Sequence, residues 1–292
     1  MSGVLAFSMW GALPIYFIIV DSVSPLEMVL HRVVWALPFT ALIIMLRRQW
    51  HEVKRVLLDK RSMALLATAA AVLSINWLVF TWAAQNERIF EASLGYYINP
   101  LMMVLVGFAF LGERLRPVQV AAVALAATGV AVLTFSAGQF PLIAITLASA
   151  FTLYGVIRKK LVVGAVPGLF VELLILFPLA SAYLYYRVQG GLSPFTWNDP
   201  QLFGLLLLAG PLTVLPLVFF AIAARRLRLS TIGFIQFIGP TGQFLVGYYF
   251  GEELTTPYLI CFICIWSAVS LFVFDAVRFG RRSRIAARVE AT

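Results

Sequence analysis

Ten apolar stretches divide this chain of 292 residues, and each is about as long as the roughly 20 residues that a helix needs to cross a bilayer. A transmembrane barrel would instead show alternating strands of roughly 10 residues. The sequence is 62% hydrophobic and 12% charged, with a mean hydropathy of +0.94, which excludes an ordinary soluble domain. We therefore expect an all-α integral membrane protein with ten transmembrane helices near residues 3–20, 26–46, 62–84, 92–111, 118–136, 141–157, 167–186, 201–224, 230–250 and 257–277.

The second half of the chain repeats the first at an offset of 140 residues. Residues 92–117 return as residues 232–257, and two prolines and a glutamate stay in register. The identical pairs are Ile98/Ile238, Pro100/Pro240, Leu105/Leu245, Val106/Val246, Gly107/Gly247, Phe110/Phe250, Glu113/Glu253 and Pro117/Pro257. Because each half holds an odd number of helices, the second half would cross the membrane in the opposite sense. We expect two inverted five-helix repeats, residues 1–138 and 139–292, as in many secondary transporters.

The basic residues give the orientation, since short cytoplasmic loops carry an excess of Lys and Arg. With the N-terminus inside, the cytoplasmic segments hold nineteen of the 22 basic residues, and the outside loops hold only Arg88 and Arg187. Both termini are therefore expected in the cytoplasm. The net charge of +9 follows from this topology, and its dispersal over loop ends argues against a nucleic-acid partner.

Catalytic motifs are missing from the sequence. It contains two histidines, His31 and His51, and no HExxH, GxSxG or P-loop pattern. We expect no enzyme, no metal site and no cofactor. The expected partners are the lipid bilayer and a small-molecule substrate, because a carrier needs only a few polar or aromatic side chains turned into an internal cavity.

Two of the expected helices, the fourth and the ninth, carry corresponding polar faces around a proline. At helical spacing the quartets are Ser93, Tyr96, Pro100 and Met103 in one and Gly233, Gln236, Pro240 and Gln243 in the other. Tyr96 set against Gln236 would line a cavity with pseudo-symmetric walls, and Tyr97 and Asn99 lie slightly around the same helix. An ordinary helix contact with satisfied polar groups is the alternative.

Other candidates for substrate contact are Asn76 and Trp77 in the third expected helix, Trp10 in the first and Tyr154 in the sixth. Each aromatic residue taken alone is more often a packing or interface residue. Pro100, Pro216 and Pro240 are expected hinges, since proline interrupts helical hydrogen bonding.

The sequence places three ionisable residues, Glu27, His31 and Arg32, close together in the second expected helix. At the 140 offset Arg32 corresponds to Glu172 in the seventh. One interpretation is a gating or proton-linked network between these two helices, because His31 could titrate near neutral pH. The other interpretation is a structural ion pair near the outer interface, with the basic partner of Glu172 undetermined.

Several runs resemble bacterial RarD-type transporters of the EamA branch of the drug/metabolite transporter superfamily. They are SPLEMVLHRVVW from Ser24, NWLVFTWA from Asn76, EASLGYYINPL from Glu91, FLGERLRP from Phe110 and YGVIRK from Tyr154. The resemblance covers essentially the whole chain. It implies a ten-helix bacterial inner-membrane carrier related to amino-acid exporters of the YddG type, with Trp10, Asn76, Tyr97, Asn99 and Tyr154 on the helices that line the cavity.

The leading hypothesis is an inner-membrane exporter of amino acids, aromatic and apolar ones included, or of similar metabolites, working by alternating access through a midplane cavity. A shortage of midplane charge favours a neutral zwitterion as substrate. Drug efflux is a variant of this hypothesis, and a membrane sensor that binds a solute without moving it is an alternative of another class. Proton coupling and oligomeric state are left open by the sequence.

Overall fold

The computed structural model describes residues 1–111, 116–136, 140–195, 199–226 and 235–289, and helices are the only regular secondary structure in these ranges. The expected all-helical class is confirmed. The helices are α1 (Ser2–Ile19), α2 (Pro25–Leu46), α3 (Trp50–Leu58), α4 (Lys60–Gln85), α5 (Ile89–Leu111), α6 (Pro117–Ser136), α7 (Leu142–Lys159), α8 (Ala165–Gln189), α9 (Pro200–Arg226), α11 (Ile238–Tyr249) and α12 (Thr256–Val289).

Seven helices in the described ranges are long and apolar enough to cross a membrane, namely α1, α2, α4, α6, α8, α9 and α12. The chain is thus a multi-pass membrane protein. The other three expected spans coincide with α5, α7 and α11, and residues 112–115 and 227–234 beside α5 and α11 lie outside the description. The total of ten spans stays a prediction.

Local capping residues set several of the helix starts. Ser24 precedes α2, where its side chain accepts a hydrogen bond from the Glu27 amide and Pro25 occupies the first turn. Asp59 accepts hydrogen bonds from the Arg61 and Ser62 amides at the start of α4. These side chains satisfy backbone donors that a helix end leaves without intrahelical partners.

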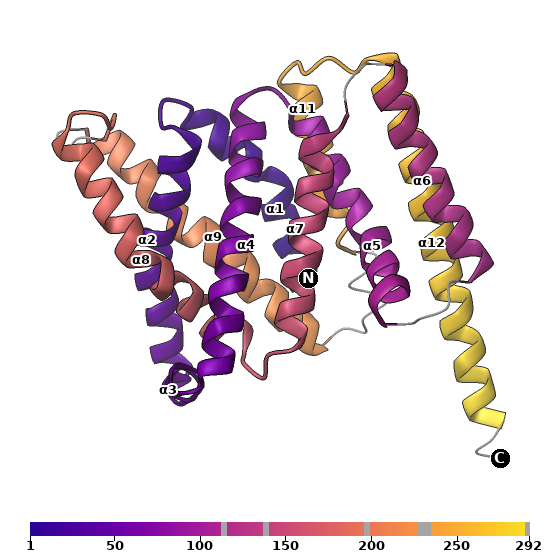
Figure 1. The fold of residues 1–292 in the computed structure, drawn as a ribbon, viewed down its shortest axis with the longest axis horizontal. Helices are drawn as coiled ribbons and strands as arrows, with labels where there is room; N and C mark the ends of the chain where they lie inside the picture. The colour runs from indigo at the N-terminus through magenta and orange to yellow at the C-terminus, as the bar shows by residue number, and fades with distance from the viewer. Residues whose placement is uncertain (112–115, 137–139, 196–198, 227–234, 290–292) are drawn as a thin grey trace.

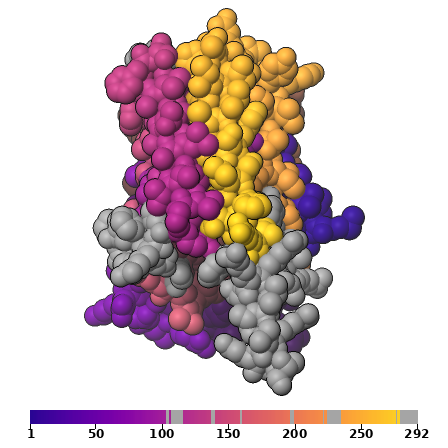
Figure 2. All heavy atoms as spheres, turned by 90° about the vertical axis from the view of Figure 1, so that its right-hand side faces the viewer, coloured from indigo at the N-terminus to yellow at the C-terminus, as the bar shows by residue number. Residues whose placement is uncertain are grey.

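The helices of the two halves of the chain pack against one another rather than forming separate bundles (Figure 1). α1 packs on α9 and α11, α4 packs on α7 and α8, α2 packs on α8 and α9, and α5 packs on α7 and α11. α6 and α12 pack mainly on each other and lie side by side at one edge of the molecule (Figure 2). Exchanging α1, α2, α4, α5 and α6 with α7, α8, α9, α11 and α12 maps this set of contacts onto itself.

The two ends of the bundle differ in charge. The connections from α2 to α4 and from α7 to α8 lie at the lower end in Figure 1, together with the C-terminal end of α12. The segment from Arg47 to Arg61 alone carries six basic residues there. The loops between α1 and α2, α4 and α5, and α8 and α9 lie at the upper end, near Arg88 and Arg187.

α1 and α11 cross with their backbones in contact at Gly11 and Gly242. A Cβ added at Gly242 would lie 2.9 Å from the Gly11 Cα, and one added at Gly11 would lie 3.1 Å from the Gly239 carbonyl oxygen. Only glycine fits this approach, which is common where membrane helices cross closely.

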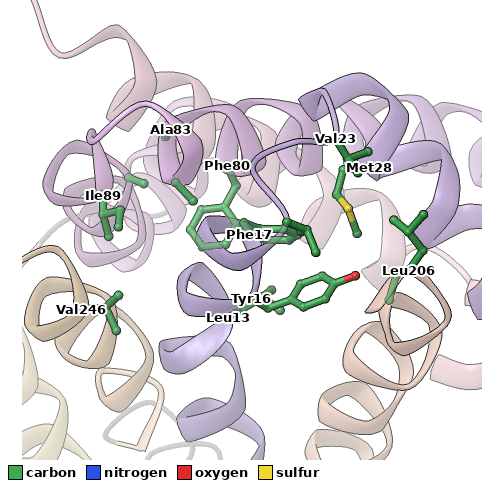
Figure 3. Close-up of a cluster of buried hydrophobic side chains, with 14 of the residues drawn as sticks. Leu13, Tyr16, Phe17, Val23, Met28, Phe80, Ala83, Ile89, Leu206 and Val246 are labelled. Atoms are coloured by element: carbon green, nitrogen blue, oxygen red, sulfur yellow. The ribbon is translucent and has the colours of Figure 1, made fainter. Parts of the chain in front are cut away.

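A large apolar cluster fills the upper part of the bundle between α1, α4 and α9 (Figure 3). Phe17 on α1 packs edge-on against Phe80 on α4, with ring centroids 5.9 Å apart. The neighbouring Tyr16 points toward α9, where its hydroxyl donates to the Leu205 carbonyl at 2.9 Å. This cluster supports the first group of polar residues described next.

Candidate functional site

Arg32 is a buried cation on α2 that faces neutral groups. Arg32 is only 5% exposed, and its Nε donates to the Thr213 hydroxyl on α9 at 3.1 Å. The guanidinium carbon lies 4.2 Å from the ring centroid of Trp77 on α4 and 5.5 Å from that of Phe17. Nη1 is buried and has no hydrogen-bond partner among the described residues.

Asn76 and Tyr96 form a short hydrogen-bonded network beside this cation. The Tyr96 hydroxyl donates to Asn76 Oδ1 at 3.1 Å, and Asn76 Nδ2 donates to the Leu147 carbonyl on α7 at 3.3 Å. The Tyr96 ring packs edge-on against Phe80 on α4 and Phe151 on α7. The network joins α4, α5 and α7, and it leaves Tyr96 half-buried.

Glu27, His31 and Arg32 lie close together in the sequence of α2, but in the structure they face different neighbours. Glu27 accepts from Arg187 Nη2 at 3.2 Å and from the Ser193 hydroxyl, so its partners come from α8 and the loop after it. His31 Nε2 lies 4.0 Å from Glu27 Oε1. Arg32, one residue further on, turns toward α4 and α9 instead.

Glu172 belongs to a separate network at the lower end of the bundle. It accepts from the Tyr154 hydroxyl at 3.2 Å and from Arg158 Nη1 at 3.3 Å, both on α7. Arg158 Nη2 also donates to the carbonyls of Gly164 and Ala165 at the start of α8. Arg32 and Glu172 therefore belong to two networks in different places, and Tyr154 belongs to the one at Glu172.

Trp10 and Gln243 meet where α1 crosses α11. Gln243 Nε2 donates to the Trp10 carbonyl at 3.3 Å, while Gln243 Oε1 is buried without a hydrogen-bond partner in the described part of the chain. The Trp10 ring packs near Phe7 and Phe220. Gln236 is half-buried just before α11.

The neighbouring tyrosines of α5, Tyr96 and Tyr97, face different helices. Tyr97 faces α11, where its hydroxyl is 2.6 Å from Thr241 Oγ1, and its ring stacks on Phe237 just before that helix. Asn99 faces α7, and its Oδ1 accepts from the Thr152 hydroxyl at 2.8 Å. One turn of α5 thus sends three polar residues to different neighbours.

The three expected hinge prolines are buried but differ in their place along the helices. Pro100 lies inside α5 and Pro216 lies inside α9. Pro240 lies in the first turn of α11, where a missing amide donor costs no helical hydrogen bond.

The sequence did not point to two hydrogen-bonded carboxylates at the upper end of the bundle, Glu252 and Glu91. Glu252, in the loop after α11, accepts from the Phe90 amide with both oxygens, at 2.9 and 3.0 Å. Glu91 accepts from the Ile143 amide at 2.9 Å and from Arg88 Nη2 at 2.6 Å. Burial raises the pKa of Glu252 to about 7. The repeat had drawn attention to Glu253, which is exposed, and to Glu113, which lies outside the described residues.

The sequence did contain hints of the residues that pair with Glu172 and Glu27. Tyr154 and Arg158 are four residues apart and so share a helical face, and Arg187 is one of two basic residues in the expected outer loops. Thr213 gave no signal, because one hydroxyl in an apolar helix is unremarkable. No group of three or more His, Cys, Asp or Glu that could hold a metal ion occurs within the described ranges.

Known proteins resemble the chain along nearly its full length. A model of the EamA-like transporter family matches residues 1–135. A protein of Vibrio cholerae serotype O1, named an uncharacterized transporter, is 45% identical over 280 residues, which cover 96% of this chain and 93% of that protein. Protein RarD of Escherichia coli K12 is 40% identical, covering 95% of this chain and 94% of the relative.

Two further comparisons are more distant. The chloramphenicol-sensitive protein RarD of Pseudomonas aeruginosa is 33% identical over 275 residues, covering 92% of this chain and 91% of that protein. One solved crystal structure, titled only as that of a protein, has a TM-score of 0.59 at 19% identity and covers 95% of this chain and 97% of its own. At that identity the likeness concerns the fold alone.

Proposed function

We propose an export function for this chain, which belongs to the RarD-like members of the EamA-like transporter family in the drug/metabolite transporter superfamily. The solutes would be amino acids, aromatic and apolar ones included, or similarly small amphipathic metabolites. The chain would act in the bacterial inner membrane with both termini in the cytoplasm. The observation that carries the proposal is the near full-length similarity to a Vibrio cholerae protein named a transporter, together with the match to the EamA-like transporter family.

The proposed architecture is a pair of inverted repeats, residues 1–138 and 139–292. Its support is the set of helix contacts that maps onto itself when the two halves are exchanged. Substrate would bind between the halves, where Trp10, Asn76, Trp77, Tyr96 and Gln243 supply aromatic surface and hydrogen-bonding groups. Tyr97, Asn99, Tyr154 and Gln236 lie farther around this region and would shape its walls.

Alternating access requires a closure at each end of the bundle, and the two ion-pair networks suit that role. Glu27 with Arg187 ties α2 to α8 at the upper end, and Glu172 with Arg158 ties α7 to α8 at the lower end. Opening one end would separate its pair while the other pair stays formed. The buried prolines of α5 and α9 would allow the bending that such a change demands.

Counterflow in proteoliposomes tests this function. Proteoliposomes that contain the purified protein are loaded with unlabelled amino acids, and labelled amino acids are added outside, with and without a pH gradient. Saturable counterflow without a gradient is the expected result, because exchange needs only a carrier that alternates. Flux only with the gradient would instead assign coupling to protons, and absence of saturable flux for every amino acid would reject the proposal.

Drug efflux is the second candidate, favoured by the name of the chloramphenicol-sensitive relative. Chloramphenicol in the same counterflow assay separates the two, since it has an aromatic body without a carboxylate. Saturable exchange of chloramphenicol but not of amino acids would transfer the assignment to drugs.

A further inference from the structure

The structure holds one buried cation that no carboxylate of the described residues neutralises. Ion pairs in these ranges join Arg88 to Glu91, Arg116 to Asp275, Arg158 to Glu172 and Arg187 to Glu27. Arg32 is in none of them. Its contacts are the Thr213 hydroxyl and the faces of two aromatic rings, and Nη1 lacks a partner.

Such an arrangement is costly without an anion, because ionised groups inside a membrane protein normally pair with one another or line a ligand path. The Arg32 guanidinium is also held in one orientation. Thr213 fixes Nε from one side, while the Trp77 ring covers one face of the guanidinium plane. An arginine fixed in this way is suited to planar recognition of a carboxylate through its remaining N–H groups.

We propose that Arg32 binds the carboxylate of the transported solute, and that this carboxylate, rather than an ammonium group, defines the substrate class. The proposal rests on the proposed transport function. Trp77, Phe17 and the half-buried Tyr96 would receive the aromatic or apolar body of the same molecule. A single guanidinium balances one carboxylate, so a monoanion fits better than a phosphate dianion.

Within the ranges that the structure describes, no carboxylate beside Arg32 offers an ammonium group a comparable partner. The carboxylates of Glu27 and Glu172 already accept hydrogen bonds from Arg187 and Arg158, in networks separate from Arg32. The site therefore requires the acid and tolerates loss of the amine. The sequence had favoured a neutral zwitterion, and a zwitterionic amino acid remains a substrate under this proposal because it carries the required carboxylate.

Three probes with the same phenyl body test the proposal, namely phenylalanine, 3-phenylpropanoate without the amine, and phenylalaninamide without the acid. Binding to the purified full chain in detergent is measured by ligand-induced thermal shift. Phenylalanine and 3-phenylpropanoate should both stabilise the protein, and phenylalaninamide should not. Equal binding of acid and amide, binding of phenyl phosphate in preference to the acids, or no binding of either acid at millimolar concentration would overturn it.

Arg32→Gln should weaken binding of both acids by about ten-fold to a hundred-fold, since a charge-assisted hydrogen bond is lost. Arg32→Lys keeps the charge and should retain part of the affinity. Arg116→Gln is the matched control, because it removes an arginine that already has a carboxylate partner, Asp275, and the ratio of acid to amide binding should not change. Unaltered acid binding in Arg32→Gln would refute the role of this residue.

If Arg32→Gln does not fold, Thr213→Val replaces it, since loss of the Nε contact should weaken acid binding several-fold with all charges kept. Counterflow then separates this inference from the transport function. Acid-selective binding without flux would reject transport and keep the Arg32 site. Flux that is equal for acid and amide would keep transport and reject the site.

Discussion

Arg32 in α2 and Glu172 in α8 are 140 residues apart, the offset that relates the two halves of the sequence, yet their surroundings differ. Glu172 is 1% exposed and receives hydrogen bonds from Tyr154 and Arg158. Arg32 is almost as buried, but its polar contact is a neutral hydroxyl. Both charges are buried, but Glu172 has a cationic partner and Arg32 has no anionic one among the described residues. The partner therefore distinguishes a charge that holds helices together from one that is available to a ligand.

The strongest test of this contrast is Glu172→Gln. The substitution leaves Arg158 largely buried opposite a neutral amide, and we expect a loss of about 3 kcal/mol in unfolding free energy. Thermal unfolding in detergent, followed by tryptophan fluorescence, measures it. Replacing both partners, as Glu172→Leu with Arg158→Met, should recover most of the loss. An unchanged stability in Glu172→Gln would remove the structural role of the pair.

Glu252 extends this comparison, because it is a carboxylate that accepts from a backbone amide and not from an arginine. Its pKa is raised to about 7, chiefly by burial, with Glu91 raising it further and Arg88 opposing the rise. The folded chain thus holds this proton more tightly than the unfolded chain. The resulting stability is present in full below the ordinary pKa near 4.5 and is lost as pH rises to about 7.

We expect the unfolding temperature to fall as the pH is raised from about 5 to 7, and Glu252→Gln to flatten this slope. Glu253→Gln is the matched control, since that neighbour is exposed and should keep the wild-type slope. A slope that survives in Glu252→Gln would assign the pH dependence to another group.

A smaller effect is expected from Glu27→Gln at the upper end. Its partner Arg187 has a side chain that is 24% exposed, so water can solvate the cation once the carboxylate is gone. The unfolding free energy should drop by about 1 kcal/mol, less than in Glu172→Gln. A larger drop at Glu27 than at Glu172 would reverse the order of the two networks.

The smallest effect on stability is expected at the cation itself. Arg32→Met removes a buried charge without stranding a carboxylate, although it loses the contact with the Trp77 ring. The unfolding free energy should stay within about 1 kcal/mol of wild type or rise. A loss as large as that of Glu172→Gln would mean that Arg32 has an anionic partner in the free protein.

The sequence was most informative where one physical constraint dominates. A helix that crosses lipid needs about 20 apolar residues, so stretches such as residues 26–46 and 62–84 predicted α2 and α4 to within a few residues. Asn76, Trp77 and Tyr96, chosen from the sequence as candidates for substrate contact, lie in one interior region. They are polar or aromatic residues within apolar helices, and such residues need internal partners.

What the sequence could not supply is which helix faces each side chain. Residues 31 and 32 are adjacent in α2, but a helix turns about 100° per residue, so their side chains point to different neighbours. Tyr96 and Tyr97 differ in the same way, and only the packing of α5 against α7 and α11 decides which of them faces α11. Arg158 was counted among the cytoplasmic loop charges, although it turns back to Glu172.

The glycine crossing of α1 and α11 carries a genetic consequence. Gly11 lies in the first half of the chain and Gly242 in the second, and each occupies space that a methyl group on the other side would need. A change to alanine at either position therefore disturbs the packing of α1 on α11 from both sides. A second substitution at the other position cannot make room, because that position already holds glycine, the smallest residue. Selection therefore acts on these two distant positions of the chain as on one position.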